Sequence, residues 1–170
     1  ATFPSVDLLR FVGVVAPRRE SKWAKSHTLL IDLAKDADVL LKGMNSVTRY
    51  EMRRAEAKDG LALVTIDSSV RLSVDTFCDY YDEFAESKAL RPVFRGRMYE
   101  LARQGSLFLS AVSDANGNVL VQHAHVVMPQ RAMLLYSASK FREIDDPAAR
   151  SLIGRANRLS HWRDMLAAKE

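Results

Sequence analysis

The sequence predicts an α+β fold in which a largely antiparallel sheet is flanked by helices. Some segments repeat apolar residues every three or four positions, as an amphipathic helix does, whereas others are short runs of apolar and β-branched residues typical of strands. Three strand-like segments follow one another closely in the second half of the chain, which indicates a meander. With 170 residues, 48% of them hydrophobic, the chain is expected to form a single domain, 1–170, with a packed core.

The first third of the chain is predicted to contain two strands and two helices. Residues 11–15 form a short apolar run and residues 28–33 alternate, so both are expected to be strands. Asp36 is placed to cap a short helix. Asn45 is placed to end that helix and to cap a second one over residues 47–58.

The middle of the chain continues with a strand and two more helices. Gly60 ends the preceding helix, and residues 61–66 are the apolar and β-branched residues of a strand. Ser73 is a candidate cap for a helix over residues 74–88, whose aromatic residues recur at helical spacing. Residues 94–104 read as a further helix.

The meander and a long final helix complete the prediction. Strands are expected at residues 106–112, 118–128 and 132–139, with residues 114–117 forming the first hairpin turn. Asp146 is a good N-cap for the final helix, because a proline follows it at the first helical position.

Charge and cysteine content restrict the classes of function. The net charge of +4 favours an anionic partner, although acidic residues intersperse the basic ones. The single cysteine, Cys78, excludes an internal disulfide framework, and its aromatic neighbours predict a buried structural thiol. No apolar run approaches the ~18 residues of a membrane span, and no signal-peptide pattern opens the sequence. A cytoplasmic location is therefore expected.

Two arginines one turn apart, Arg49 and Arg53, are candidates for binding a carboxylate or phosphate. The alternative is a solvated helix face on which they pair with Glu51 and Glu56.

A His-x-His pair, His123 and His125, lies on the central strand of the meander. Strand alternation points both imidazoles to one side, where His123 or His125 could act as a general base, and His125 is the candidate chosen. The alternative is that both are hydrogen-bonded residues within the sheet. A catalytic zinc needs a third ligand that the spacing does not supply, so no metal site is expected.

The turn between the last strand and the final helix contains Ser139 and Arg142, which could hold an anion on free amides. Glu143 and Asp146 compete with an anion there, and helix capping alone explains them.

The final helix places Gly154, Asn157, Arg158, His161 and Asp164 on one side. A glycine, an asparagine and a histidine are poor choices for helix stability alone. Asn157 and Arg158 are therefore candidate binding residues, and His161, within reach of Asp164, is a candidate catalytic base. The alternative is a polar helix face that packs under a loop.

Three stretches, residues 44–57, 121–142 and 149–169, together resemble FemAB-like proteins of the GNAT acyltransferase superfamily, in particular bacterial members. The resemblance implies a GNAT fold, possession of a core meander, and transfer of an acyl or aminoacyl group to an amine. It implies acyl-CoA or aminoacyl-tRNA as donor, no tightly bound cofactor, and a small-molecule or cell-wall or polysaccharide precursor amine as acceptor.

The chain departs from the GNAT pattern in two places. Ser151 stands where the pyrophosphate loop has Gln or Arg, which weakens the expectation of acetyl-CoA. The strand that normally follows the final helix is missing, so these residues are expected to be part of a longer protein.

The function expected from these observations is acyl transfer to an amine. The alternatives are a non-catalytic binding or assembly domain that has kept the fold, and an RNA-binding module that uses the basic helices.

Overall fold

The computed structural model describes residues 28–142 and 144–169, with the backbone alone at Arg142. The chain divides into two units, Ala1–Ile31 and Asp32–Glu170, and the fold belongs to the second. The order of its elements confirms the predicted α+β class. In chain order they are α1 (Ala37–Gly43), α2 (Ser46–Ala57), β1 (Ala62–Ile66), α3 (Arg71–Ser87), α4 (Arg95–Arg103), β2 (Leu107–Ser113), β3 (Val119–Met128), β4 (Arg131–Ser139), the 3₁₀ turn η1 (Lys140–Arg142) and α5 (Pro147–Ala167).

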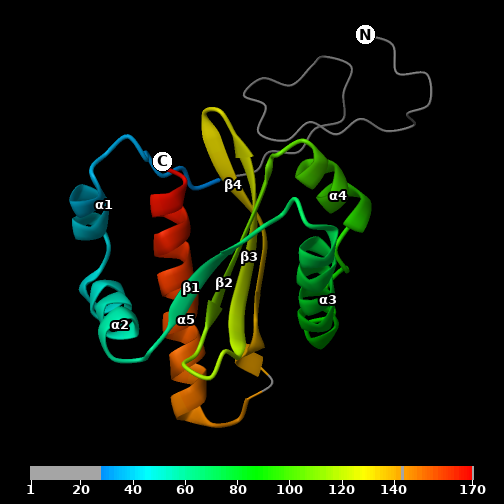
Figure 1. Ribbon diagram of the computed structural model, residues 1–170. Helices are drawn as coiled ribbons and strands as arrows, with labels where there is room; N and C mark the ends of the chain where they lie inside the picture. Colours follow the sequence, from blue (N-terminus) through cyan, green and yellow to red (C-terminus); the bar gives the residue numbers. More distant parts are fainter. Residues whose placement is uncertain (1–27, 143, 170) are drawn as a thin grey trace, which may run out of the picture. The chain divides into compact units, whose positions relative to one another are not determined.

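The four strands form one antiparallel sheet in the order β1-β2-β3-β4 (Figure 1). Asp114 begins the turn between β2 and β3, and Gly117 closes it at a φ of +82°, a conformation that costs glycine little. The pairing of β3 with β4 shifts register between Ala124 and His125. The predicted meander is confirmed.

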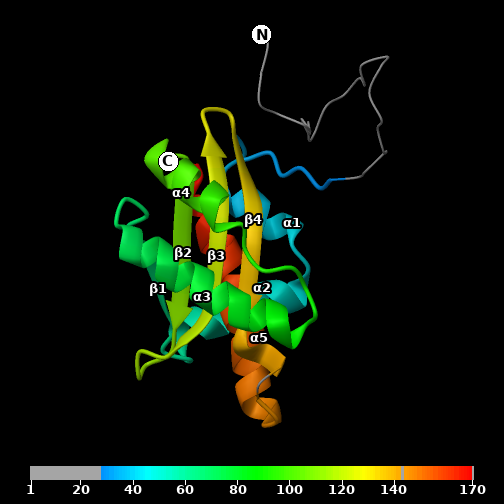
Figure 2. The ribbon, with the colours of Figure 1, turned by 90° about the vertical axis from the view of Figure 1, so that its right-hand side faces the viewer.

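Helices cover both faces of the sheet (Figures 1 and 2). On one face α3 and α4 bury an apolar cluster that includes Phe77, Met98 and Leu109. On the other face α5 packs on β2 and β3, and α2 packs on α5. There a smaller apolar cluster includes Val121 and Ile153.

Capping residues position α5 and α2 as predicted. The Asp146 carboxylate accepts a hydrogen bond from the amide of Ala149 at 2.7 Å, and Pro147 is the first residue of α5. The Asn45 side chain accepts from the amide of Thr48 at 2.7 Å at the start of α2. None of the helices in the described part of the chain is both long and apolar enough to cross a membrane.

Two predictions for the N-terminal half are not borne out as made. Residues 28–33 do not form a strand, because the described residues offer them no neighbouring strand to pair with, and Leu29 and Leu30 are exposed. Helix α3 begins at Arg71 rather than at residue 74. Its first turn is stabilised by Arg71, which pairs with Asp75 at 3.3 Å. The predicted strand 11–15 lies outside the described residues.

The Cys78 side chain lies on α3 and is fully buried in the cluster beneath that helix, as predicted. Burial raises the pKa of its thiol to about 11. The thiol is therefore protonated at neutral pH, which is the state of a structural cysteine rather than of a nucleophile.

Candidate functional sites

A cluster of polar side chains lies buried between β3 and α5. His123 and His125 stand two residues apart on β3, and strand alternation turns both towards α5. Asn157, His161 and Asp164 follow one another at spacings of three and four on α5, so they share the helix face that meets β3. The sequence predicted both shared faces, but not that the two would meet.

His123 occupies the centre of this histidine–aspartate cluster and is fully buried. Its Nδ1 lies 2.6 Å from Oδ2 of Asp164, and its Nε2 lies 3.2 Å from Oδ1 of Asn157. The hydroxyl of Ser160 lies 3.1 Å from the same Nδ1. Both ring nitrogens therefore have partners on α5, which fixes the orientation of the imidazole.

The two histidines chosen from the sequence as bases flank His123. Nε2 of His125 lies 3.9 Å from Oδ2 of Asp164, and the ring of His161 lies 4.4 Å from that of His123, centroid to centroid. Burial lowers the pKa of His125, although the carboxylate of Asp164 opposes it. Burial and then the neighbouring His123 lower the pKa of His161 to about 4. Both imidazoles are therefore uncharged at neutral pH.

Three buried polar atoms of this face have no hydrogen-bond partner among the described residues: Oγ of Ser110, Nδ1 of His125 and Oδ1 of Asp164. Each such atom costs about 1–3 kcal/mol, and most buried polar atoms in folded proteins are paired. The ligand atoms of His123, His125 and Asp164 lie within 4.8 Å of one another, so these residues could hold a metal ion. The cluster therefore contains donor and acceptor atoms that the contacts within the protein leave unpaired.

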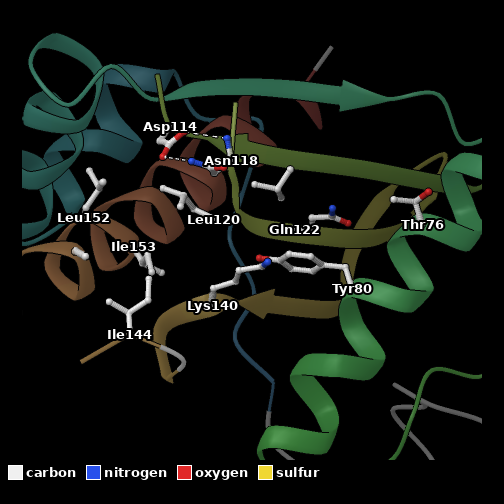
Figure 3. A pocket seen from close by; sticks show the side chains of 12 residues that line it. Thr76, Tyr80, Asp114, Asn118, Leu120, Gln122, Lys140, Ile144, Leu152 and Ile153 are labelled. Atoms are coloured by element: carbon white, nitrogen blue, oxygen red, sulfur yellow. Dashed lines mark hydrogen bonds between the residues drawn. The ribbon is translucent and has the colours of Figure 1, made fainter. Parts of the chain in front are cut away.

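A cavity of about 510 Å³ opens on the α3 face of the sheet and extends to the first turns of α5 (Figure 3). Its volume falls within the range of small-molecule sites, and its wall is mostly apolar. The lining residues are Thr76, Tyr80, Asp114, Asn118, Val119, Leu120, Gln122, Lys140, Ile144, Ala149, Leu152 and Ile153.

Gln122, Tyr80 and Lys140 supply polar groups at the α3 end of this cavity (Figure 3). Gln122 is 4% exposed, and its Oε1 has no hydrogen-bond partner among the described residues. Lys140 is the first residue after β4, and its Nζ lies 5.6 Å from the centre of the Tyr80 ring. An amide and an ammonium beside an apolar wall can bind a ligand that has an apolar part and an anionic or carbonyl group.

The predicted arginine pair on α2 already has partners within the chain. Arg49 donates hydrogen bonds to the main-chain oxygens of Lys42 and Met44, which tie α2 to the end of α1. Arg53 donates to the main-chain oxygen of Arg49 at 3.2 Å. Neither arginine lines the cavity. Their binding of an anion stays a prediction.

The two candidate binding residues on α5 separate. Asn157 faces the sheet, where it contacts His123, whereas Arg158 faces α2. Arg158 pairs with Glu51 of α2 at 2.9 Å and donates to the main-chain oxygen of Gly154 at 2.9 Å. Of the residues predicted to share one face of α5, Asn157 therefore belongs to the buried cluster and Arg158 to the contact between α2 and α5. Ligand binding by either residue stays a prediction.

The turn after β4 places the side chain of Lys140 in the cavity, whereas the residues predicted from the sequence were Ser139 and Arg142. Ser139 is half-buried and pairs opposite Val121, and the side chain of Arg142 lies outside what the structure describes. Lys140, between them, lines the cavity. A lysine directly after a strand and a lone amide, Gln122, within an apolar strand were the signals that could have indicated these residues.

Comparison with known proteins supports the fold. No family model matches the sequence, and no curated protein matches it. A solved structure described as "Crystal structure of FemX" is similar, with a TM-score of 0.61 and 14% sequence identity. The similarity covers 80% of this chain and 48% of FemX, so the chain spans about half the length of that protein. At this identity the likeness shows a FemX-like fold.

Proposed function

We propose that this chain carries an acyl- or aminoacyl-transferase of FemAB-like type, which moves a group from a thioester or ester donor to an amine. Two features support the proposal. One is the FemX-like fold, and the other is the cavity that residues of α3, β3, η1 and the first turns of α5 line. The observation that carries it is the presence of a buried amide with an unpaired oxygen, Gln122, and a cation, Lys140, in one apolar pocket.

In this proposal the cavity binds the reacting end of the donor. The apolar wall accommodates the acyl or aminoacyl side chain, and Lys140 binds a phosphate or carboxylate. The unpaired Oε1 of Gln122 accepts a hydrogen bond from the attacking amine, and its Nε2 donates one to the acyl oxygen. Such a donor stabilises the negative charge that develops on that oxygen when the amine attacks. The acceptor is an amine on a small molecule or on a cell-wall precursor.

The chemical step is a substitution at a carbonyl carbon. The amine lone pair forms the new C–N bond, and the C–S or C–O bond to the donor then breaks. A base removes a proton from nitrogen, and the leaving thiolate or alkoxide takes one up. The sequence assigns the base to His125 or His161. Both are uncharged and able to accept a proton, but they lie on the α5 face of the sheet, whereas Gln122 lies on the α3 face.

A transfer assay tests the proposal. Labelled aminoacyl-tRNA and acyl-CoA donors are incubated with the purified chain and with amine acceptors, and the labelled amide is measured. We expect transfer by the wild type and at least a tenfold loss in the variant Lys140→Met. The control Lys58→Met removes an exposed lysine at the end of α2 and should retain full activity. Equal activity of both variants would remove the cavity from the proposal.

Glutamine variants of the two histidines test the base assignment separately. If His125 or His161 accepts the proton, its replacement lowers kcat by about 10²–10⁴-fold without a matching change in KM. An unchanged kcat in both variants would assign the base to another group.

The alternative of a non-catalytic binding domain is favoured by one observation, the separation of the two predicted bases from the cavity by the sheet. This alternative predicts donor binding without transfer. The RNA-binding alternative has less support, because two of the arginines of α5 pair with acids of α2, Arg158 with Glu51 and Arg163 with Glu56. Weak dependence of nucleic-acid affinity on salt would exclude it.

A further inference from the structure

We propose that His123, His125 and Asp164 bind one divalent transition-metal ion, for which Zn²⁺ is the probe. The ion would lie between β3 and α5, on the opposite side of β3 from Gln122 and the cavity. The inference does not depend on the cavity, because none of the three residues lines it. An ion held by His125 would exclude this residue as the base of the proposed transfer.

The donor set suits such an ion. Imidazole nitrogen and carboxylate oxygen are common ligands of Zn²⁺ and of other first-row transition metals. Nitrogen and oxygen ligands bind Zn²⁺ at about 2.0–2.2 Å, so two ligands of one tetrahedral ion lie about 3.3–3.6 Å apart. The 3.9 Å between Nε2 of His125 and Oδ2 of Asp164 exceeds this range by a few tenths of an ångström. The whole set spans 4.8 Å, so the two ligand atoms that are farthest apart must approach each other by about 1 Å to bind one ion.

The surroundings of His123 resemble those of a metal-binding imidazole. Metal-binding histidines usually donate the N–H of the second ring nitrogen to a carbonyl or carboxylate oxygen. Here Nε2 of His123 faces Oδ1 of Asn157 at 3.2 Å, which leaves Nδ1 to face Asp164. A bound ion would replace the 2.6 Å contact between Nδ1 and Oδ2 of Asp164 with bonds from both groups to the metal, and a proton held between them would be released to solvent.

Buried atoms that have no hydrogen-bond partner, although they can bind a metal, distinguish this site from an ordinary hydrogen-bond network. Asp164 is 5% exposed, and its Oδ1 has no hydrogen-bond partner within the described residues. The contacts of His123 provide partners for Asn157 and Ser160, but not for this oxygen or for Nδ1 of His125. His161, whose ring centroid lies 4.4 Å from that of His123, is a candidate for a fourth ligand.

Metal binding to the full chain tests the proposal. The protein, without a histidine tag, is treated with a chelator, dialysed and titrated with Zn²⁺ by calorimetry, and Co²⁺ binding is followed by its visible absorption. We expect one ion per chain, the Co²⁺ spectrum of a four- or five-coordinate site, and a raised Tm with Zn²⁺. Failure of the wild type to bind Zn²⁺ would overturn the proposal.

Variants locate the bound ion. Asp164→Asn should weaken Zn²⁺ binding at least 100-fold, and the matched control Asp79→Asn, an exposed carboxylate on α3, should leave it unchanged. If Asp164→Asn fails to fold, His125→Gln decides, because the hydrogen bonds of His123 to α5 remain in that variant. Wild-type affinity in a folded Asp164→Asn or His125→Gln protein would contradict the proposed site.

Discussion

At the scale of single residues, Gln122 and His123 are chain neighbours whose side chains serve opposite faces of the sheet. Strand alternation sends Gln122 towards α3 and the cavity, and His123 towards α5. Both are almost completely buried, but His123 is fully hydrogen-bonded and the oxygen of Gln122 is not. The unpaired oxygen of Gln122 therefore lowers the stability of the ligand-free protein and is available to accept a hydrogen bond from a ligand.

Replacement of Gln122 by leucine separates these two contributions. The free energy of unfolding should stay constant or rise by about 1 kcal/mol, because an apolar side chain removes an unpaired buried polar group. Transfer activity should fall about 10²-fold through loss of the donor to the acyl oxygen. Urea unfolding and the transfer assay measure the two effects. A strongly destabilised variant that keeps its activity would show that Gln122 is structural.

The lowered pKa of His161, which lies on α5, predicts that the stability of the metal-free protein depends on pH. The unfolded chain protonates His161 below about pH 6.5, whereas the folded chain does so only near pH 4. His161 faces His123, His125 and Asp164, and burial is the main cause of its lowered pKa. Its stabilising contribution is therefore complete above about pH 6.5 and is lost as the pH falls towards 4.

Urea unfolding between pH 4 and 7 in the presence of a chelator measures this loss. The free energy of unfolding should drop by about 2 kcal/mol over that window through His161, after allowance for its partial exposure. His161→Gln should remove most of this part of the slope. An identical slope in wild type and variant would assign the pH dependence to other groups.

At the scale of elements, ion pairs of different burial hold α5 to α2 and to the turn that follows α2. Arg155 pairs with Asp59, and both side chains are about 10% exposed or less. Arg158 pairs with Glu51, but its side chain is 43% exposed. Burial determines how much stability is lost when one partner of a pair is removed. An exposed pair is screened by water and contributes little, whereas a buried charge that loses its partner keeps its desolvation cost.

Matched amide variants compare the two pairs. Asp59→Asn should lower the free energy of unfolding by about 3 kcal/mol, and Glu51→Gln by less than about 1 kcal/mol. Thermal or urea unfolding of both variants checks this order. Equal losses would mean that the Arg155–Asp59 pair is not protected from solvent.

Most elements could be predicted from local sequence, and the error has a local explanation. Asn45 and Asp146 were recognised as helix caps because capping depends on residues within one turn. The strand at 28–33 was wrong, because alternation describes a strand only when a neighbouring strand can pair with it.

The sites were harder to predict because they depend on contacts between distant residues. Alternation placed His123 and His125 on one face, but their contact with Asp164 crosses about 40 residues of sequence. Ser139 and Arg142 were predicted instead of Lys140, because the cavity that Lys140 lines depends on how η1 and α5 pack on the sheet.

At the scale of the whole molecule, the two sites lie on different faces of one sheet. The chain has a FemX-like fold, in which the cavity is the proposed donor site, whereas the histidine–aspartate cluster joins β3 to α5. The arginines proposed from the sequence, Arg49, Arg53 and Arg158, belong to the contacts of α2 and are held by other groups of the chain. Donor binding is therefore expected at the cavity rather than along α2.

Mapping of donor binding by amide chemical shifts tests this central claim most directly. The labelled protein is titrated with acetyl-CoA and, separately, with a non-hydrolysable 3′-aminoacyladenosine analogue. The largest shifts are expected at Leu120, Gln122, Lys140 and Leu152, which line the cavity, and Lys140→Met should abolish them. Shifts confined to Arg49, Arg53 and Arg158, or no saturable shifts with either donor, would contradict the assignment of the cavity as the donor site.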